Sequence, residues 1–525
     1  MPRRTTGRDP DEPSTAPTTA DAAESSARPV ARAAESGLHV RAGVLLLLLA
    51  LLFTMYASSF PGMRNSNEGS HYALVRAMAD GRLSVDGFEQ YTRFVDYSKR
   101  DGHYYSDKPP GVSALALPLY AVGRLVSGSA ASSRAPLPDL AMTRPDPVNG
   151  LVPPFEEWTS NLLAAVAGTV TVVLVFLTAR ELGAATAPSI FVAAAVGLGS
   201  MVWRYATVLF AHSVSAALVM AAVYLTARAF RREGRREIAW LGVVVGVAVA
   251  VDYSNLVLMA GIVIALVVGR AGRGARAVGR DLATLAAAAL IPIALLAAYQ
   301  WKAFGSPLHT SYRYKELDRF AFSRDPFEAY SAPLTNLGPL LFQLRWGVVA
   351  WCPLLLLAPV GLWFVARRSR PAALLLVLAS LPLFVLIAKF VTPEGGPTHD
   401  ARYVTPALAP LIVSIAVALT DIASPRWRRV AWAVAGVLGA ASFLLQGARL
   451  LLMPAHRERM IGGPAVVRST FIDLGIAVRT AMRDAFPSLR YAPVALVLAV
   501  AVAAAAWALV TRRGTPPPAG GEGRA

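Results

Sequence analysis

The chain of 525 residues is 55% hydrophobic and only 16% charged, a balance that excludes an ordinary water-soluble domain. Its formal net charge of +18 would suit a nucleic-acid-binding protein, but many of the arginines lie in short loops between apolar runs. The positive-inside rule for membrane proteins explains that placement better. The single cysteine, Cys352, excludes an intramolecular disulfide and argues against a cysteine-based metal site.

The two ends of the chain differ in composition from the rest. Residues 1–40 are rich in Ala, Ser, Thr, Pro and Arg without periodicity, so we expect a disordered cytoplasmic tail. Residues 513–525, with Pro and Gly, are expected to form a second one. Residues 41–512 between them are expected to form one polytopic membrane domain. Because the first apolar run starts only near Ala42, we expect an uncleaved span rather than a removed signal peptide.

Apolar runs long enough to cross about 30 Å of hydrocarbon recur from Ala42 to Val510, and in lipid such runs must be helices. Taking the basic loops as cytoplasmic gives about 12 spans, or 13 if the short Pro118-containing piece 111–126 also crosses. The prediction is an all-α integral membrane protein in the cell membrane, with both termini cytoplasmic and a large first extracytoplasmic loop, 61–156, carrying interfacial helices. The loops used are Arg228–Arg236, Arg270–Arg280, Arg367–Arg370, Arg426–Arg429 and Arg512–Arg513.

The first outer loop holds the densest charged and aromatic residues, between Arg64 and Pro110. Its first half contains Asn67-Glu68 followed by His71-Tyr72-Ala73, and the spacing of apolar residues predicts a short amphipathic helix with Glu68 at its beginning. Its second half ends in Asp107-Lys108-Pro109-Pro110, where the prolines would fix the direction in which the chain enters the next apolar helix.

These two elements resemble the C superfamily of polyprenyl-phosphate-sugar-dependent membrane glycosyltransferases. The resemblance is closest to the family 39-like group of lipid A aminoarabinose transferases and protein O-mannosyltransferases. Those proteins carry an acidic pair before a Tyr-Ala helix, matched here by Asn67-Glu68 and Tyr72-Ala73, and an acidic-Lys-Pro-Pro element, matched by residues 107–110. The second match is the more specific. Segments 304–307, 395–396 and 402–406 extend the resemblance over roughly residues 42–420.

The resemblance implies a glycosyltransferase that moves a sugar from a polyprenyl-phosphate donor to an extracytoplasmic glycan, lipid or protein acceptor. Its partners would be those substrates and membrane lipids, with no nucleic acid. Lys108 is expected to bind the donor phosphate as a point charge, and Arg402 to act as a second phosphate clamp. Glu68 and Asp96 are the expected catalytic carboxylates, with Asp107 as a rival, because attack by an acceptor hydroxyl is helped by a base.

Two positions depart from the family pattern. Asn67 stands where the family has the first acid of its pair, and an amide cannot act as a general base. His212 corresponds to a second family acid near the end of a later helix. We therefore expect either a reaction reorganised around Glu68, Asp96 and His212, or a chain that has lost the reaction.

A divalent metal ion is left open as a cofactor. His71, His103, Asp101 and Asp107 could form such a site with Glu68, since imidazole and carboxylate groups suit these ions, although nothing in their spacing demands it. The same histidines, with Asn67 and His212, are also candidates for substrate contact. Asp252, between two apolar segments, is most simply a residue that caps an outer turn.

Two other functions compete with a transferase. A transporter or flippase of lipid-linked sugars would need ionisable groups near the membrane midplane, and the candidate groups here lie near the ends of predicted spans. A catalytically silent scaffold that binds lipid phosphate would suit the replacement of family acids by Asn67 and His212.

Overall fold

The computed structural model describes residues 46–60, 62–63, 65–127, 154–232, 234–395, 400–452 and 491–512. The tails expected at 1–40 and 513–525 lie outside these ranges, so both remain predictions. The chain divides into the units Met1–Leu48 and Leu49–Ala525, and nearly all the described residues belong to the second. The first described helix is Leu46–Ser58.

The described chain is almost entirely helical, which confirms the predicted fold class. Seven helices are long and apolar enough to cross a membrane, and four shorter apolar helices accompany them. The predicted number of spans stays a prediction. The main helices after the first loop are α4 (Phe155–Glu181), α5 (Thr186–Gly199), α6 (Val202–Tyr205), α7 (Ala211–Arg231), α8 (Arg235–Val251), α9 (Asn255–Arg270), α10 (Ala275–Phe304), α14 (Ala358–Arg368), α15 (Arg370–Leu378), α16 (Leu381–Ala388), α17 (Thr405–Asp421), α18 (Pro425–Leu452) and α21 (Ala492–Arg512).

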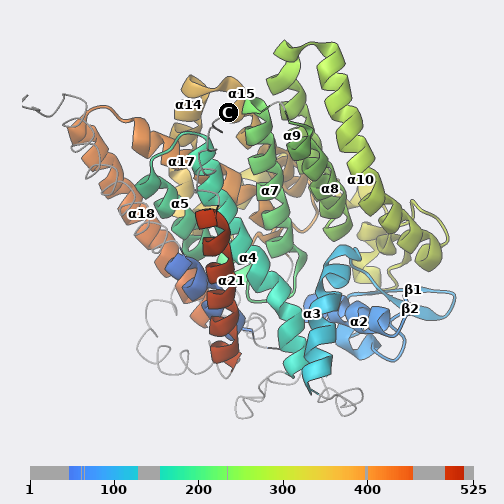
Figure 1. Ribbon diagram of the computed structural model, residues 1–525. Helices are drawn as coiled ribbons and strands as arrows, with labels where there is room; N and C mark the ends of the chain where they lie inside the picture. Colours follow the sequence, from blue (N-terminus) through green and yellow to red (C-terminus); the bar gives the residue numbers. More distant parts are fainter. Residues whose placement is uncertain are drawn as a thin grey trace, which may run out of the picture. The chain divides into compact units, whose positions relative to one another are not determined.

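Charged residues lie in the first or last turn of several helices, where they complement the helix dipole. Glu156 and Glu157 occupy the first turn of α4 and Arg180 its last turn, where each complements the helix dipole. α4 packs against α5 and α7, α7 against α8, and α8 against α10, so these neighbours form a continuous bundle (Figure 1). The turn predicted between two apolar segments at 252–255 is present between α8 and α9.

The first loop folds into a small structured unit against the bundle. It contains α2 (Ser66–Ala79), η1 (Glu89–Thr92), the strands β1 (Tyr97–Arg100) and β2 (His103–Ser106), and α3 (Gly111–Ser127). The strands are antiparallel, and they form the one sheet in the described residues. Figure 1 shows this unit in blue and cyan beside α4 and α8.

The turn between the two strands takes an unusual backbone conformation. Asp101 and Gly102 both have positive φ, +50° and +85°, as a tight two-residue hairpin turn requires. Tyr97 is thereby paired with Ser106, which places the chain after β2 directly beside the start of β1. Lys108 follows two residues later.

The helix predicted near Glu68 is present as α2, but it is not amphipathic with one open face. Every residue from Glu68 to Ala77 is buried in the protein. α2 packs against α3 and η1, so its polar residues point into protein rather than toward solvent. The piece 111–126 is also helical, and it forms α3, which continues through Pro118 and packs along α4.

The segment after α10 returns to the first loop. Gly305 has φ +76° and ends α10 in the left-handed conformation that favours glycine. The segment then forms η4 (Ser311–Tyr314), which packs on β1, and η5 (Asp318–Arg324). Short helices lead on to α14: α11 (Pro326–Ala329), η6 (Leu334–Asn336), α12 (Leu337–Phe342), α13 (Val348–Trp351) and η7 (Pro353–Leu357).

Candidate active site

Four charged side chains from three segments form one buried network. The Lys108 ammonium lies 3.3 Å from the Asp96 carboxylate and 3.2 Å from that of Asp107. Lys315 lies 2.8 Å from the other side of Asp107, so the order is Asp96, Lys108, Asp107, Lys315. The exposed fraction of these side chains is 14%, 12%, 0% and 9%. Buried charges are tolerated in proteins only when they are paired in this way, so the ion pairs are an integral part of the fold.

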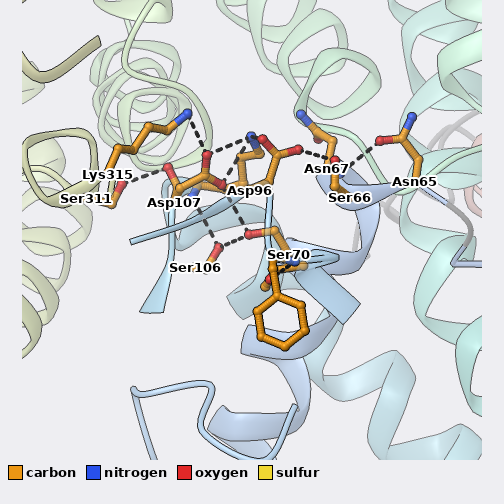
Figure 2. Close-up of polar contacts among 12 residues, drawn as sticks. Asn65, Ser66, Asn67, Ser70, Asp96, Ser106, Asp107, Ser311 and Lys315 are labelled. Carbon is orange, nitrogen blue, oxygen red and sulfur yellow. Dashed lines mark hydrogen bonds and ion pairs between the residues drawn. The ribbon is translucent and has the colours of Figure 1, made fainter. Parts of the chain in front are cut away.

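Serines from the neighbouring elements orient the two carboxylates. Ser66 donates a 2.7 Å hydrogen bond to Asp96, and Ser70 donates one of 3.2 Å to Asp107. Ser66 and Ser70 are four residues apart in α2, so they lie on the same face of that helix. Figure 2 shows Ser70 and Ser106 on one side of Asp107, with Lys315 approaching from another.

Hydrogen bonds to the first loop hold the segment that carries Lys315. The Ser98 hydroxyl donates to the carbonyl of Ser311 at 2.7 Å, and the Ser311 hydroxyl donates to the carbonyl of Asp107 at 2.8 Å (Figure 2). The Tyr97 hydroxyl donates to Glu316, the residue after Lys315, at 2.9 Å. These contacts span more than 200 residues of sequence and bring the second lysine to the site.

The electrostatics of the network favour the charged forms of Asp96 and Lys108. Burial alone would raise the pKa of Asp96, but Lys108, Lys315, the Ser66 hydroxyl and Arg402 outweigh burial and lower it to about 2. Burial opposes the charged form of Lys108, and the carboxylates of Asp107 and Asp96 more than compensate, so its pKa is raised. Asp96 and Lys108 therefore stay charged across the physiological range.

Glu68 has a definite structural role at the start of α2. The Asn65 side chain accepts a hydrogen bond from the Asn67 backbone, and one Glu68 oxygen accepts a 2.7 Å hydrogen bond from the Asn65 backbone. This reciprocal pattern is a capping box, which fixes the first turn of the helix. Glu68 thus stabilises the helical turn that carries Ser66, the residue whose hydroxyl donates to Asp96. The expectation that Glu68 acts as a base stays a prediction.

The three candidate histidines lie in different surroundings. His71 is buried in α2, and its pKa is lowered to about 3 by burial and by Lys108, so it is neutral near pH 7. His212 is buried at the start of α7, packed edge-on against Tyr205 and within electrostatic range of Lys108. His103 lies on β2 with 61% of its side chain exposed, and its Nδ1 is 2.6 Å from Asp86. Only the first two adjoin the charge network.

Arg402 lies beside the network in a second cluster of charges. It is buried, its guanidinium stacks over Phe210 and Tyr403, and its charge reaches Asp96. Asp400 nearby is fully buried, pairs with Arg204 at 3.6 Å and accepts a hydrogen bond from the Tyr205 hydroxyl. Gly396 and His399, which precede this cluster, lie outside the described residues.

The metal site that the sequence left open does not fit the geometry of the described residues. Within the described ranges, no group of three or more His, Cys, Asp or Glu side chains is placed to hold an ion. Asp107 and Asp96 face lysines, while Asp101 is 76% exposed and pairs with Arg100. His103 contacts Asp86 through its Nδ1. We therefore route no step through a metal ion.

The fold and site define a predominantly helical, multi-pass membrane protein with a buried lysine–carboxylate network at one end of its bundle. Neither a protein-family model nor a curated protein sequence matches the chain. The crystal structure of ArnT from Cupriavidus metallidurans bound to undecaprenyl phosphate does match in fold. It is 16% identical over 88% of this chain and 76% of that chain, with a TM-score of 0.51.

Two further solved structures are similar at lower scores. Apo ArnT from the same organism is 17% identical over 90% of this chain and 76% of its own, with a TM-score of 0.45. The apo oligosaccharyltransferase of Archaeoglobus fulgidus is 14% identical over 81% of this chain and 56% of its own, with a TM-score of 0.41. The match to undecaprenyl-phosphate-bound ArnT shows that this chain shares the fold of that protein.

Sequence reasoning missed Lys315. It lies eight residues after the segment 304–307, which belongs to the resemblance. A signal was present, because Lys315 lies outside the basic loops taken as cytoplasmic, so the positive-inside rule does not explain it. The ion pair with Asp107 supplies an explanation.

Proposed function

We propose that this protein is a membrane glycosyltransferase that moves a sugar from a polyprenyl-phosphate donor to an acceptor hydroxyl. The observation that carries the proposal is the pair of buried lysines, Lys108 and Lys315, on either side of Asp107 at the entry to α3. The solved structure that shares this fold contains undecaprenyl phosphate, a polyprenyl phosphate. Two ammonium groups that converge near the start of an apolar helix suit the headgroup of such a lipid.

The proposed roles follow from where charge develops in the reaction. As the bond between the anomeric carbon and the phosphate breaks, negative charge grows on the departing phosphate, and cations already in place stabilise it. Lys108 and Lys315 would supply these cations, with Arg402 as a third group nearby. Asp96 and Asp107 would hold the lysines in position, and Glu68 would fix the turn that presents Ser66 to Asp96.

We further propose that the site faces the extracytoplasmic side, with both termini cytoplasmic, and that the acceptor is an envelope glycan, lipid or protein. The arginine-rich loops support this orientation through the positive-inside rule. The first loop, which carries Asp96 and Lys108, would then meet a donor that arrives laterally in the outer leaflet.

Replacement of Lys108 by Ala tests the proposal. Purified protein is incubated with undecaprenyl-phosphate-linked pentoses and hexoses, tritiated in the sugar, and with membrane extract as a source of acceptor. We expect wild type to transfer label, and Lys108→Ala to transfer it at least about 100-fold more slowly, the usual cost of losing one stabilising charge. Binding of undecaprenyl phosphate should also weaken.

The matched control is Lys99→Ala, which removes a lysine of the same hairpin that is 36% exposed and pairs with Glu316 at 3.7 Å. It should leave transfer close to wild type. Full activity in Lys108→Ala would remove the central element of the proposal. Tight binding of the lipid by wild type without transfer of any sugar would instead indicate a scaffold.

A further inference from the structure

Asp252 lies in the turn between α8 and α9 and has a role beyond capping it. One carboxylate oxygen, Oδ1, accepts hydrogen bonds from the backbone and the hydroxyl of Ser254, at 2.9 and 2.8 Å. This confirms the expected cap. The other oxygen, Oδ2, has no hydrogen-bond partner among the described residues, and the side chain is only half-buried. The cap therefore fixes the carboxylate while leaving one oxygen available.

Close backbone packing brings this turn to the lysine network. Gly111, three residues after Lys108, lies so near the end of α8 that a Cβ built on it would be 2.5 Å from the Ala250 carbonyl. Only glycine permits that approach, and Asp252 follows two residues after Ala250. The charge of Lys108 accordingly reaches the carboxylate of Asp252.

Aromatic side chains make a second connection between the turn and the network. The ring of Tyr253 contacts that of Tyr312 edge-on, with centroids 5.9 Å apart, and Gln300 donates a 3.1 Å hydrogen bond to the Tyr253 hydroxyl. The Lys315 ammonium lies 5.5 Å from the centroid of the Tyr312 ring. Asp252 is thus linked to both lysines, through Gly111 on one side and through Tyr253 and Tyr312 on the other.

The carboxylates near the lysines differ in their partners. Asp96 and Asp107 form ion pairs with lysines, whereas Asp252 forms none with any side chain in the described part of the chain. Burial raises the pKa of Asp252 above that of an exposed aspartate, against the opposing effects of Ser254 and Lys108. A general base works best when its pKa moves toward the working pH.

We propose that Asp252 is the proton acceptor of the glycosyl transfer, taking the proton of the acceptor hydroxyl on Oδ2. The proposal rests on the transferase function proposed above. In the step, the acceptor oxygen forms a bond to the anomeric carbon while the bond from that carbon to the phosphate oxygen breaks. The bonding pair leaves with the polyprenyl phosphate, which Lys108 and Lys315 hold. The hydroxyl proton moves to Asp252 and later to water.

Asp252→Asn separates this role from the cap, because an amide oxygen can still accept the two hydrogen bonds of Ser254 but cannot take a proton. We expect the rate of sugar transfer at saturating donor to fall at least about 100-fold, the usual contribution of a general base. Binding of undecaprenyl phosphate should remain within about threefold of wild type. Ser254→Ala, which removes only the hydroxyl bond, is the matched control and should retain most of the rate.

The pH dependence gives a readout that loss of the cap would not produce. Proton transfer requires ionised Asp252, so kcat/KM for wild type should fall about tenfold per pH unit below the pKa of this group. The titratable groups that face Asp252 are Lys108, Tyr253, Tyr312 and Tyr330. Their pKa values all lie above the acidic pH range in which Asp252 takes up a proton. The residual activity of Asp252→Asn should lack this acid limb.

Three patterns of result distinguish the possible failures. If wild type transfers sugar, Lys108→Ala does not, and Asp252→Asn keeps both the rate and the acid limb of wild type, then Asp252 is only a turn cap. If wild type neither transfers sugar nor binds the lipid, the transferase function itself is wrong. If Asp252→Asn loses lipid binding along with the rate, its effect is structural, and the proposal is overturned.

Discussion

Asp107 and Asp252 lie close to the same lysine, yet their surroundings differ. Asp107 is fully buried and makes ion pairs with Lys108 and Lys315, while Asp252 is half-buried and is bound only by Ser254 in the described chain. Asp107 compensates two buried cations, whereas Asp252 has no lysine partner in the described chain and leaves one oxygen without a hydrogen bond. The comparison indicates different roles for the two aspartates. Asp107 positions the two lysines, and Asp252 remains available for the proposed proton transfer.

Asp107→Ala should produce the largest effect of any change near the site. Lys108 and Lys315 would lose an ion pair in a buried setting, so we expect the free energy of unfolding to drop by about 3–5 kcal/mol and sugar transfer to become undetectable. Thermal unfolding in detergent measures the first effect. Asp252→Ala should lower the free energy of unfolding by only about 1 kcal/mol, as loss of a cap does.

The control for this experiment is Asp80→Ala, which removes a carboxylate of the same loop that is 37% exposed and pairs with Arg82 and Arg124 at 3.5 Å. It should shift the unfolding temperature little. Equal losses of stability in Asp107→Ala and Asp252→Ala would contradict the comparison, because the two carboxylates would then play the same structural role.

Gly111→Ala tests whether the position of Asp252 relative to Lys108 matters. The added methyl group would be 2.5 Å from the Ala250 carbonyl, so the end of α8 must move away from α3. We expect the rate of transfer to fall roughly tenfold, since displacements of about 1 Å at a reacting group have effects of this order or larger. Binding of undecaprenyl phosphate should be nearly unchanged, because both lysines keep their partners.

Gly436→Ala in α18 is the matched control, since a methyl group there meets nothing within 4 Å. It should retain the wild-type rate. A Gly111→Ala protein with the wild-type rate would show that the distance between the two regions is not critical, and so weaken the role proposed for Asp252.

The sequence predicted the fold, and it identified Asp107 and Lys108 as candidate residues, because both features are local. Apolar runs predict helices directly, and the Asp107-Lys108-Pro109-Pro110 element lies within one short segment, so its resemblance to the family could be seen. The turn at Asp252 was also predicted, with its capping role, from two apolar segments that meet at polar residues.

Contacts made across the sequence could not be predicted in this way. Lys315 reaches Asp107 because a hydrogen bond joins Ser98 and Ser311, which are more than 200 residues apart. No local sequence pattern predicts such a contact. The same applies to Gly111 and Ala250. The expectation of an amphipathic α2 was wrong, because the loop around it buries both faces, which a helical pattern cannot show.

His103→Ala should produce the smallest effect, because the hairpin carries this residue away from both aspartates of the comparison. Its side chain is 61% exposed and contacts Asp86, and exposed pairs of this kind contribute about 0–1 kcal/mol. We expect transfer and unfolding temperature to match wild type within error, as measured beside Lys108→Ala in the same membranes. A large loss of transfer would mean that the hairpin tip touches the acceptor. The region that binds substrate would then extend beyond the lysine network to the tip of the hairpin.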